Sequence, residues 1–427
     1  MTMDLRMKWL QWLKDEPRRL TRLLLMGLVT LYAGWIGYQF VRNKLYDFNL
    51  HYIAAAGFRQ GLNMYVAPRD PATSEAQLWA EVAGQHSIEH YDGPPYLYPP
   101  FTAQVVLPLT LLPPRVAGTI WLMLTGAAFV LSAWLLGRSS SLRYGAPLAY
   151  VLLLAFVPPL ATLHAGQVNG FVLLSLSLAV YGLSRRDWIR AGVGVALAAL
   201  FKLIPLALLL YLVWRQRWKA TIIAVVVLLV VLLTAPLTLG PGTLHSYGRR
   251  FPPLGRLGII FDMPPNQSLN GFYGRLLAGL ATAESIYRIY LASAVLLVLG
   301  TVACCWPLAP LGSSWRLEFA LIICALQLMA PFAWYHQLVL LLIPLFTLVT
   351  EVVVRRAPRW WLASLTLGFL VTDLHGLAWH QLAACPGWLM SRLLLSMPFY
   401  TTVMLWGMLA WLIIQGKRSG AAQGSAA

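Results

Sequence analysis

The chain has 427 residues, of which 59% are hydrophobic and 11% are charged. Soluble globular proteins carry a charge at about a quarter of their positions, so this composition excludes an ordinary soluble fold. The 32 Lys and Arg against 15 Asp and Glu give a formal net charge of +17, which in a soluble protein would indicate nucleic acid binding. In a membrane protein the same excess marks cytoplasmic loops beside anionic lipid. We therefore expect the lipid bilayer, and no nucleic acid, as a partner.

Ten apolar segments predict strong membrane spans, because each is close in length to a helix that crosses the hydrocarbon core. In chain order they lie near residues 20–41, 115–137, 144–161, 168–184, 218–238, 285–305, 317–333, 336–353, 360–378 and 397–415. A backbone in lipid must satisfy its own hydrogen bonds, so we predict an all-α, polytopic helical membrane protein with about 11–13 transmembrane helices. The first segment follows a basic stretch and is too long for a signal sequence, so we expect an uncleaved anchor.

Two further stretches leave the topology open. Residues 99–112 are short and lie between pairs of prolines, whereas 191–214 form either one span or two half-helices broken at Lys202 and Pro205. If 99–112 lies on the outer surface and 191–214 is a hairpin, all the basic clusters of the loops fall on the cytoplasmic side, as the positive-inside rule favours. If both stretches span instead, two of these clusters move outside.

The favoured topology has about 12 crossings, two of them short, with both termini in the cytoplasm. It predicts two large outer loops, at about 42–114 and 239–284. We expect one transmembrane domain over residues 1–415 and a disordered cytoplasmic tail over 416–427.

Clusters of polar residues fall at the outer ends of helices or in the outer loops of this topology. They are YDFNLHY (46–52), YLYPPF (96–101), HAGQVNG (164–170), FKLIP (201–205), NQSLNGFYGRLL (266–277) and AWYHQ (333–337). Side chains that reach one membrane face from separate segments are what a binding or catalytic site requires. We therefore predict a site at the outer face.

Asp47 starts a short amphipathic helical pattern that ends at Gly61. By spacing alone it is more simply an exposed loop acid or a helix cap beside Arg42 and Lys44. A carboxylate at the mouth of an apolar cavity can also act as a general base that takes a proton from a hydroxyl nucleophile. Asp373, within a later apolar segment, is the reserve candidate for this base.

Lys202 lies in the middle of an apolar run, where a charge is costly. It can bind an anionic phosphate as a point charge or form a structural ion pair, and the spacing favours neither. The turn with His164, Gln167 and Asn169 can likewise cap helices or face a substrate.

Asn266 and Gln267 can cap the helix that contains Arg275, or join it in binding sugar hydroxyls and phosphate. Trp334 and His336 are either ordinary residues of the membrane interface or a platform for a sugar ring. The sequence has no Walker loop, no GxGxxG, HExxH or DxD motif and no paired-cysteine site. This disfavours a nucleotide-dependent or metal-dependent mechanism and predicts no cofactor.

Several segments follow one another in a recognisable order over about the first four-fifths of the chain: YDFNLHYIAAAGFRQGLNMY, YLYPPFTAQVVLPLTLLP, HAGQVNGFVLLSLSLAVY, AGVGVALAALFKLIPLALLLYLVWRQRWK, NQSLNGFYGRLL and APFAWYHQLVLLLIP. Together they resemble glycosyltransferase family 87, the polyprenyl-phosphate-mannose-dependent alpha-1,2-mannosyltransferases. The resemblance implies a GT-C fold in the inner (plasma) membrane of a bacterium, with the active site at the outer, periplasmic side. It also implies inverting, metal-independent transfer of a single sugar, most simply mannose, from a polyprenyl-phosphate sugar donor to a lipid-linked or glycolipid acceptor.

Roles for individual residues are expected from the resemblance and from the polar clusters described above. Asp47 matches the acid expected as the base, and Lys202 matches the Lys of a K-x-x-P pattern and is expected to bind the donor phosphate with Arg249, Arg250 or Arg275. The residues expected to bind the sugar or the acceptor are His51, Tyr98, His164, Gln167, Asn169, Asn266, Gln267, Trp334 and His336.

The chain departs from the family pattern at two positions. His336 matches the first His of a W-x-H-H pattern, but Gln337 stands at the second, and Ala330 stands where a Ser usually precedes Pro331. A role that needs two adjacent histidines is therefore not implied.

Two other classes of protein stay open: a lipid-linked glycan transporter, and a glycan polymerase or ligase. A transporter would need charges along a continuous path through the bilayer, whereas Lys202 is nearly alone in mid-span, and the sequence has no internal repeat. A polymerase or ligase would transfer a preassembled oligosaccharide and rely on Arg or His of the outer loops.

Overall fold

The computed structural model describes residues 17–42, 44–66, 74–93, 95–249, 263–306, 314–355, 359–385 and 387–424. Within these residues the chain is built of helices and the turns between them, and its one β-bridge joins Asn266 to Trp334. The predicted all-α fold is therefore confirmed.

Seven helices of the described residues are long and apolar enough to cross a membrane. They are α2 (Pro17–Arg42), α6 (Pro114–Ser139), α12 (Trp218–Leu239), α15 (Ala283–Cys305), the continuous pair η3 (Tyr335–Leu341) and α17 (Leu342–Arg355), α18 (Arg359–Ala383) and α20 (Met397–Gly424). The bent pair of α7 (Gly145–Ala155) and α8 (Pro158–Ala165), which meet at 61°, is either one broken span or a re-entrant loop. Two shorter helices, α9 (Asn169–Arg185) and α16 (Trp315–Met329), complete the bundle. The chain is a multi-pass membrane protein, and the count of 12 crossings stays a prediction.

The ambiguous stretch 191–214 turns back on itself. Helix α10 (Trp188–Phe201) is followed by Lys202, the short η2 (Ile204–Leu206) and α11 (Ala207–Trp214). The guanidinium of Arg217, just after α11, lies 4.8 Å from the ring of Trp188 at the start of α10. The segment thus begins and ends at the same end of the bundle, as the hairpin alternative predicts, with Lys202 at its tip.

Basic side chains join the loops at that end of the bundle. Arg185 donates a hydrogen bond to the carbonyl oxygen of Arg138, Arg316 to that of Ser139, and Lys417 to that of Cys304. The buried ion pair between Arg215 and Glu318 (2.7 Å) lies at this end too. We call it the basic end.

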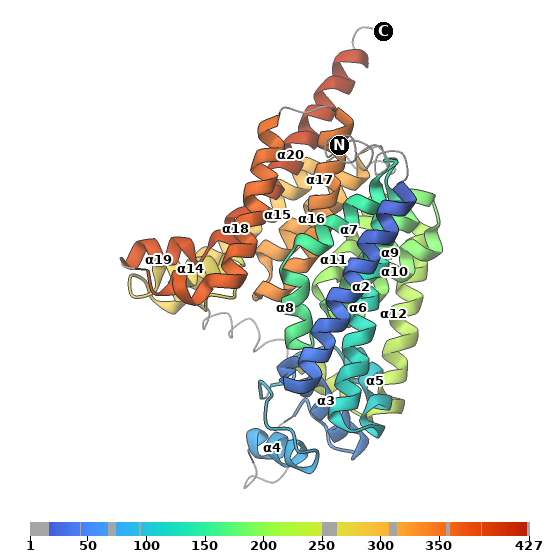
Figure 1. Cartoon of the computed structure of the whole chain (residues 1–427), viewed down its shortest axis with the longest axis vertical. Coiled ribbons are helices and arrows are strands. Elements are labelled where there is room, and N and C mark those ends of the chain that lie inside the picture. The colour runs from blue at the N-terminus through green and yellow to red at the C-terminus, as the bar shows by residue number, and fades with distance from the viewer. Residues whose placement is uncertain are drawn as a thin grey trace, which may run out of the picture.

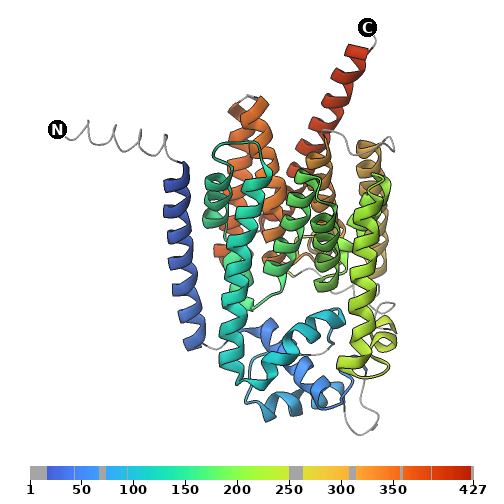
Figure 2. The same ribbon diagram turned by 90° about the vertical axis from the view of Figure 1, so that its right-hand side faces the viewer.

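Four short helices gather at the opposite end, below the spans in Figures 1 and 2: α3 (Tyr46–Arg59), α4 (Glu75–Gln85), α5 (Pro100–Val106) and η1 (Leu107–Leu111). Every residue of α3 from Asp47 to Phe58 is buried, because α4, α5, η1 and α6 pack around it. The sequence predicted an amphipathic helix with one exposed face. The difference arises because the following loop folds back over that face. The stretch 99–112 forms α5 and η1.

Two further short helices, α14 (Leu269–Leu277) and α19 (Trp388–Leu394), pack together to one side, as Figure 1 shows. The last helix, α20, continues to Gly424. Residues 416–424 extend this helix where the sequence predicted a disordered tail.

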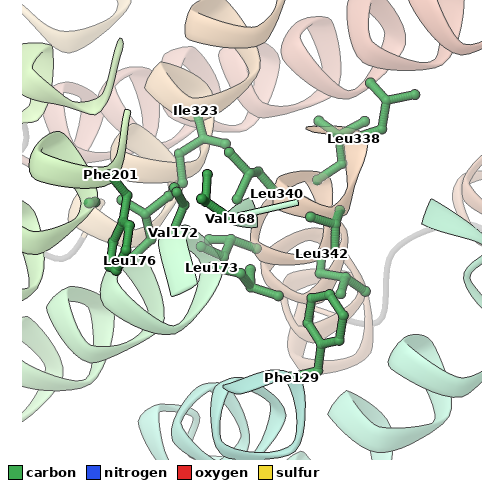
Figure 3. Close-up of a cluster of buried hydrophobic side chains, with 14 of the residues drawn as sticks. Phe129, Val168, Val172, Leu173, Leu176, Phe201, Ile323, Leu338, Leu340 and Leu342 are labelled. Carbon is green, nitrogen blue, oxygen red and sulfur yellow. The ribbon is translucent and has the colours of Figure 1, made fainter. Parts of the chain in front are cut away.

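An apolar core holds α9, α16, η3 and the tip of the hairpin in register. Figure 3 shows Val172 and Leu176 of α9 beside Phe201 of α10, Ile323 of α16 and Leu340 of η3. All five side chains are buried. Because this core lies directly behind Lys202 and Gln337, it fixes the positions of the polar groups described next.

Candidate active site

Asp47 lies in the first turn of α3 and is only 8% exposed. Its position in the first turn lets the positive end of the helix dipole stabilise the ionised carboxylate. The simpler expectation of an exposed loop acid is wrong, because α3 is covered on all sides. Asp47 is also not the N-cap, since Leu45 occupies that position.

The turn between α8 and α9 carries Gln167 and Asn169 into contact with α3. Gly166 ends α8 with a positive φ of 72°, which glycine adopts without strain. A Cβ at Gly166 would lie 2.6 Å from the Cβ of Phe48, so only glycine allows α3 to approach this closely. The amide of Gln167 donates to the carbonyl of Thr162, which closes the helix end.

Gln167 links this turn to the carboxylate. Its side chain hydrogen-bonds to Asp47, and it exchanges two hydrogen bonds with the hydroxyl of Tyr98, at 3.0 and 2.7 Å. Tyr98 in turn lies edge-on to the ring of His51, with 4.3 Å between ring centroids. Four residues predicted for the site are therefore in contact.

Lys202, at the hairpin tip, brings a positive charge near the carboxylate. Lys202 lies close enough to Asp47 to favour the ionised form of the carboxyl group. Nζ of Lys202 donates a hydrogen bond to Oε1 of Gln337 at 3.1 Å. Gln337 is held by Gln327, whose Oε1 accepts a hydrogen bond from it at 2.7 Å. Gln337, which stands where the family pattern has a second His, thus holds the ammonium group of Lys202 in place.

His336 and Asn169 complete the cluster. Nδ2 of Asn169 lies 2.8 Å from Nδ1 of His336, and the carbonyl of His336 accepts a hydrogen bond from Thr162. Oδ1 of Asn169 and Nε2 of His51 are buried without a hydrogen-bond partner among the described residues. Two polar groups in one cluster are thus left for a ligand to satisfy.

Asp92, which the sequence analysis did not single out, is the second carboxyl group of the site. The side chain of Asn49 donates to the carbonyl of His90 at 2.6 Å, which holds this loop over the first turn of α3. Asp92 itself is exposed, and its side chain lies close enough to Asp47 for its negative charge to act on that carboxyl group. Sequence reasoning missed it because nothing local marks one exposed loop acid among several.

The surroundings of Asp47 raise its pKa from the ordinary 3.8 to about 7. Burial is the largest cause, and the charge of Asp92 adds to it, whereas the hydrogen bond from Gln167 and the charge of Lys202 oppose it. Partial desolvation beside α3 raises the pKa of Asp92, and burial lowers that of His51 to about 3. Asp47 is therefore poised near neutral pH, as a general base requires, while His51 is uncharged.

Asn266, Gln267 and Arg275 form a separate polar cluster that hydrogen-bonds to backbone groups of the chain. Asn266 accepts from the amide of Ala333, Gln267 donates to the carbonyl of Leu395, and Arg275 donates to the carbonyl of Asn266. These bonds tie the second predicted outer loop to the segments around residues 333 and 395. Binding of sugar or phosphate by these three side chains stays a prediction.

The other candidates lie apart from Asp47 or outside the described residues. His164 is exposed and pairs with Gln39 of α2 at 2.8 Å, Arg249 is exposed, and Arg250 lies outside the described residues. Trp334 is half-buried and stacks on Phe332. These roles stay predictions.

Asp373, the reserve base, accepts a hydrogen bond from the amide of Val157 at 2.8 Å. Val157 precedes the two prolines at the bend between α7 and α8, where the helix leaves backbone groups unpaired. The carboxylate thus has a structural partner. In the part of the chain that the structure describes, no three His, Cys, Asp or Glu side chains are placed to hold a metal ion. Metal independence stays a prediction.

The helical bundle and the polar cluster together define a multi-pass membrane protein with a buried carboxylate and ammonium group at one end. The chain matches glycosyltransferase family 87 over residues 96–331, more than half of its length, and belongs to that family. The predicted family is confirmed.

Two relatives carry the name polyprenol-phosphate-mannose-dependent alpha-(1-2)-phosphatidylinositol pentamannoside mannosyltransferase. The one from Mycobacterium tuberculosis is 29% identical over 292 residues, which cover 67% of this chain and 64% of that protein. The one from Mycolicibacterium smegmatis is 29% identical over 289 residues, which cover 66% of this chain and 67% of that protein. No solved structure matches the chain.

Proposed function

We propose that this protein is a membrane mannosyltransferase that transfers one mannosyl group from a polyprenyl-phosphate donor to a glycolipid or lipid-linked acceptor. Family membership and the names of the two mycobacterial relatives support this activity. Those names also favour a phosphatidylinositol-based acceptor.

The observation that carries the proposal is the buried Asp47, held between Gln167 and the charge of Lys202. In the proposed reaction Asp47 takes the proton of an acceptor hydroxyl, whose oxygen bonds to the anomeric carbon from the face opposite the phosphate. The bond from that carbon to the phosphate oxygen breaks, and polyprenyl phosphate leaves with the electron pair. This displacement inverts the anomeric configuration. Lys202 stabilises the charge on the departing phosphate, so neither a second acid nor a metal is needed.

We place the site at the outer face of the membrane. Basic residues are enriched in cytoplasmic loops, and the basic end of the bundle lies opposite α3 and Asp47. The same rule puts both termini in the cytoplasm. Hydroxyls of the acceptor sugar would give partners to the buried Nε2 of His51 and Oδ1 of Asn169.

The test is transfer by the purified protein in detergent, with radiolabelled polyprenyl phosphate mannose and a phosphatidylinositol mannoside as acceptor. We expect release of polyprenyl phosphate and lengthening of the acceptor by one sugar. A preassembled glycan in the product would indicate a polymerase or ligase, whereas donor and acceptor that both stay unchanged would refute the transferase and favour a transporter.

The base is tested in the same assay with Asp47→Asn. A general base contributes about 10²–10⁴-fold, so this variant should lose nearly all transfer while it folds at least as stably as the wild type. The matched control is Glu81→Gln, which removes an exposed acid of α4 and should transfer like the wild type. Wild-type transfer by Asp47→Asn would refute the assignment and make Asp373 the next candidate.

A further inference from the structure

A pocket of about 510 Å³ opens at the basic end, between α2, the end of α6, the start of α7 and the end of α9. Four arginines from these separate segments line it: Arg22, Arg138, Arg143 and Arg185. None of its lining residues is acidic. It lies at the opposite end of the bundle from Asp47, so nothing in the proposed transfer reaction uses it.

The arginines of this pocket differ from others at the same end. Arg190 is paired with Asp187 at 3.0 Å, and the buried Arg215 is paired with Glu318. Arg22, Arg138 and Arg185, in contrast, make no ion pair with any described residue.

Aromatic rings hold the pocket arginines in place. The guanidinium of Arg138 lies 5.7 Å from the ring of Trp134, and that of Arg185 lies 5.6 Å from the ring of Tyr181. Arg185 also donates to the carbonyl of Arg138 at 3.1 Å, which joins the ends of α6 and α9. Since the side chains are held by stacking and by one another, less entropy is lost when an anion binds.

Beside the arginines and the hydroxyl residues Thr21 and Ser140, the pocket has an apolar wall. Leu142, Ala146 and Pro147 line the pocket beside the arginines, and Trp134 contributes an aromatic face. The pocket lies where two long spans, α2 and α6, reach the basic end. It therefore has a charged rim at headgroup depth and an apolar wall toward the hydrocarbon, which suits an amphiphile with an anionic head.

We propose that this pocket binds the phosphate headgroup of an anionic phospholipid of the cytoplasmic leaflet. A guanidinium matches phosphate oxygens in two parallel hydrogen bonds, and the three guanidiniums of Arg22, Arg138 and Arg185 favour a head with more than one negative charge. The same chemistry would accept a soluble phosphate, and only the apolar wall distinguishes a lipid from it. The proposal does not depend on the transferase activity.

The test compares the wild type with the triple variant Arg22→Gln, Arg138→Gln, Arg185→Gln. Native mass spectrometry counts the cardiolipin molecules that purified protein retains in mild detergent, and thermal unfolding is followed with added cardiolipin or with inorganic pyrophosphate. For the wild type we expect retained cardiolipin and a rise in Tm of about 2–4 °C on adding it. The triple variant should lose both effects.

The matched control is Arg190→Gln, which removes a basic residue from the same end but outside the pocket, and it should behave like the wild type. Equal retention and equal Tm shifts in the wild type and the triple variant would overturn the proposal. An equal Tm rise with pyrophosphate alone would overturn the lipid as the ligand. If the triple variant does not fold, the single variants Arg22→Gln and Arg138→Gln decide, and each should retain less cardiolipin than Arg190→Gln.

Discussion

Replacing Asp92 with Asn should make the proposed enzyme more active at acidic pH. The base must be ionised to act, so transfer should rise with pH through the pKa of Asp47, which is about 7. The charge of Asp92 is the second cause of that raised value, after burial. Removing it should lower the pKa and move the rising limb of the pH profile to lower pH.

The pKa shift expected for Asp92→Asn is a part of the total rise in the pKa of Asp47. The pKa of Asp47 increases from 3.8 to about 7, and burial is the largest of its causes. We therefore expect Asp92 to account for on the order of one pH unit. At pH 6 the ionised fraction of Asp47 would increase from about a tenth to about a half, so Asp92→Asn should transfer about fivefold faster there.

The assay is the dependence of kcat/KM for the donor on pH between pH 5 and 9. This ratio reports the pKa values of the free enzyme. Asp92→Glu keeps the charge and should keep the wild-type profile, and Glu81→Gln controls for loss of an exposed acid. An unchanged limb for Asp92→Asn would show that Asp92 does not act on Asp47. Loss of transfer at every pH would show that it contacts the substrate instead, and either result refutes this reasoning.

Three further predictions concern single side chains. Lys202→Met should lower kcat/KM for the donor by roughly 10–100-fold, because a hydrogen bond to a charged group contributes about 1.5–3 kcal/mol; Lys202→Arg, measured in parallel, should retain more. Asp373→Ala should leave the amide of Val157 unpaired and lower Tm, at a cost of about 1–3 kcal/mol, with transfer per folded molecule unchanged, whereas Asp373→Asn keeps an acceptor and should affect neither. Asp47→Asn should raise Tm at pH 8, because a carboxyl group whose pKa is raised on folding destabilises the protein when it is ionised, here by at most about 4 kcal/mol. This gain in stability should vanish below about pH 4, where the carboxyl group is protonated in both the folded and the unfolded state. A gain that persists below pH 4 would contradict this cause.

The spans and the hairpin could be predicted from the sequence because their causes are local. Apolar length sets a span, and the prolines of the bent segment and the K-x-x-P pattern break helices where they stand. The convergence of Asp47, Gln167 and Lys202 was predicted as well, through the topology and the family resemblance. Each of these residues interrupts an apolar context, which is what made it visible.

The parts that escaped prediction depend on contacts between distant segments. Asp92 reaches Asp47 because Asn49 holds the carbonyl of His90, a contact across about forty residues that no periodicity marks. Arg275 donates a hydrogen bond to the carbonyl of Asn266, a contact that its place in the sequence did not predict, and its binding of the donor phosphate stays a prediction.

Because Asp47 and Lys202 lie near each other, binding of the donor should change the pKa of Asp47. The charges of Asp47 and Lys202 each reduce the cost of burying the other. A donor phosphate bound to Lys202 would neutralise part of the positive charge of the ammonium group and would bring a negative charge near Asp47. The pKa of Asp47 should therefore rise when the donor binds. Asp47 would then be a stronger base in the complex than in the free enzyme. We expect kcat/KM for the acceptor at saturating donor to rise at higher pH than kcat/KM for the donor. If the two pH profiles rise at the same pH, or if the profile for the acceptor rises at the lower pH, the phosphate does not bind beside Lys202.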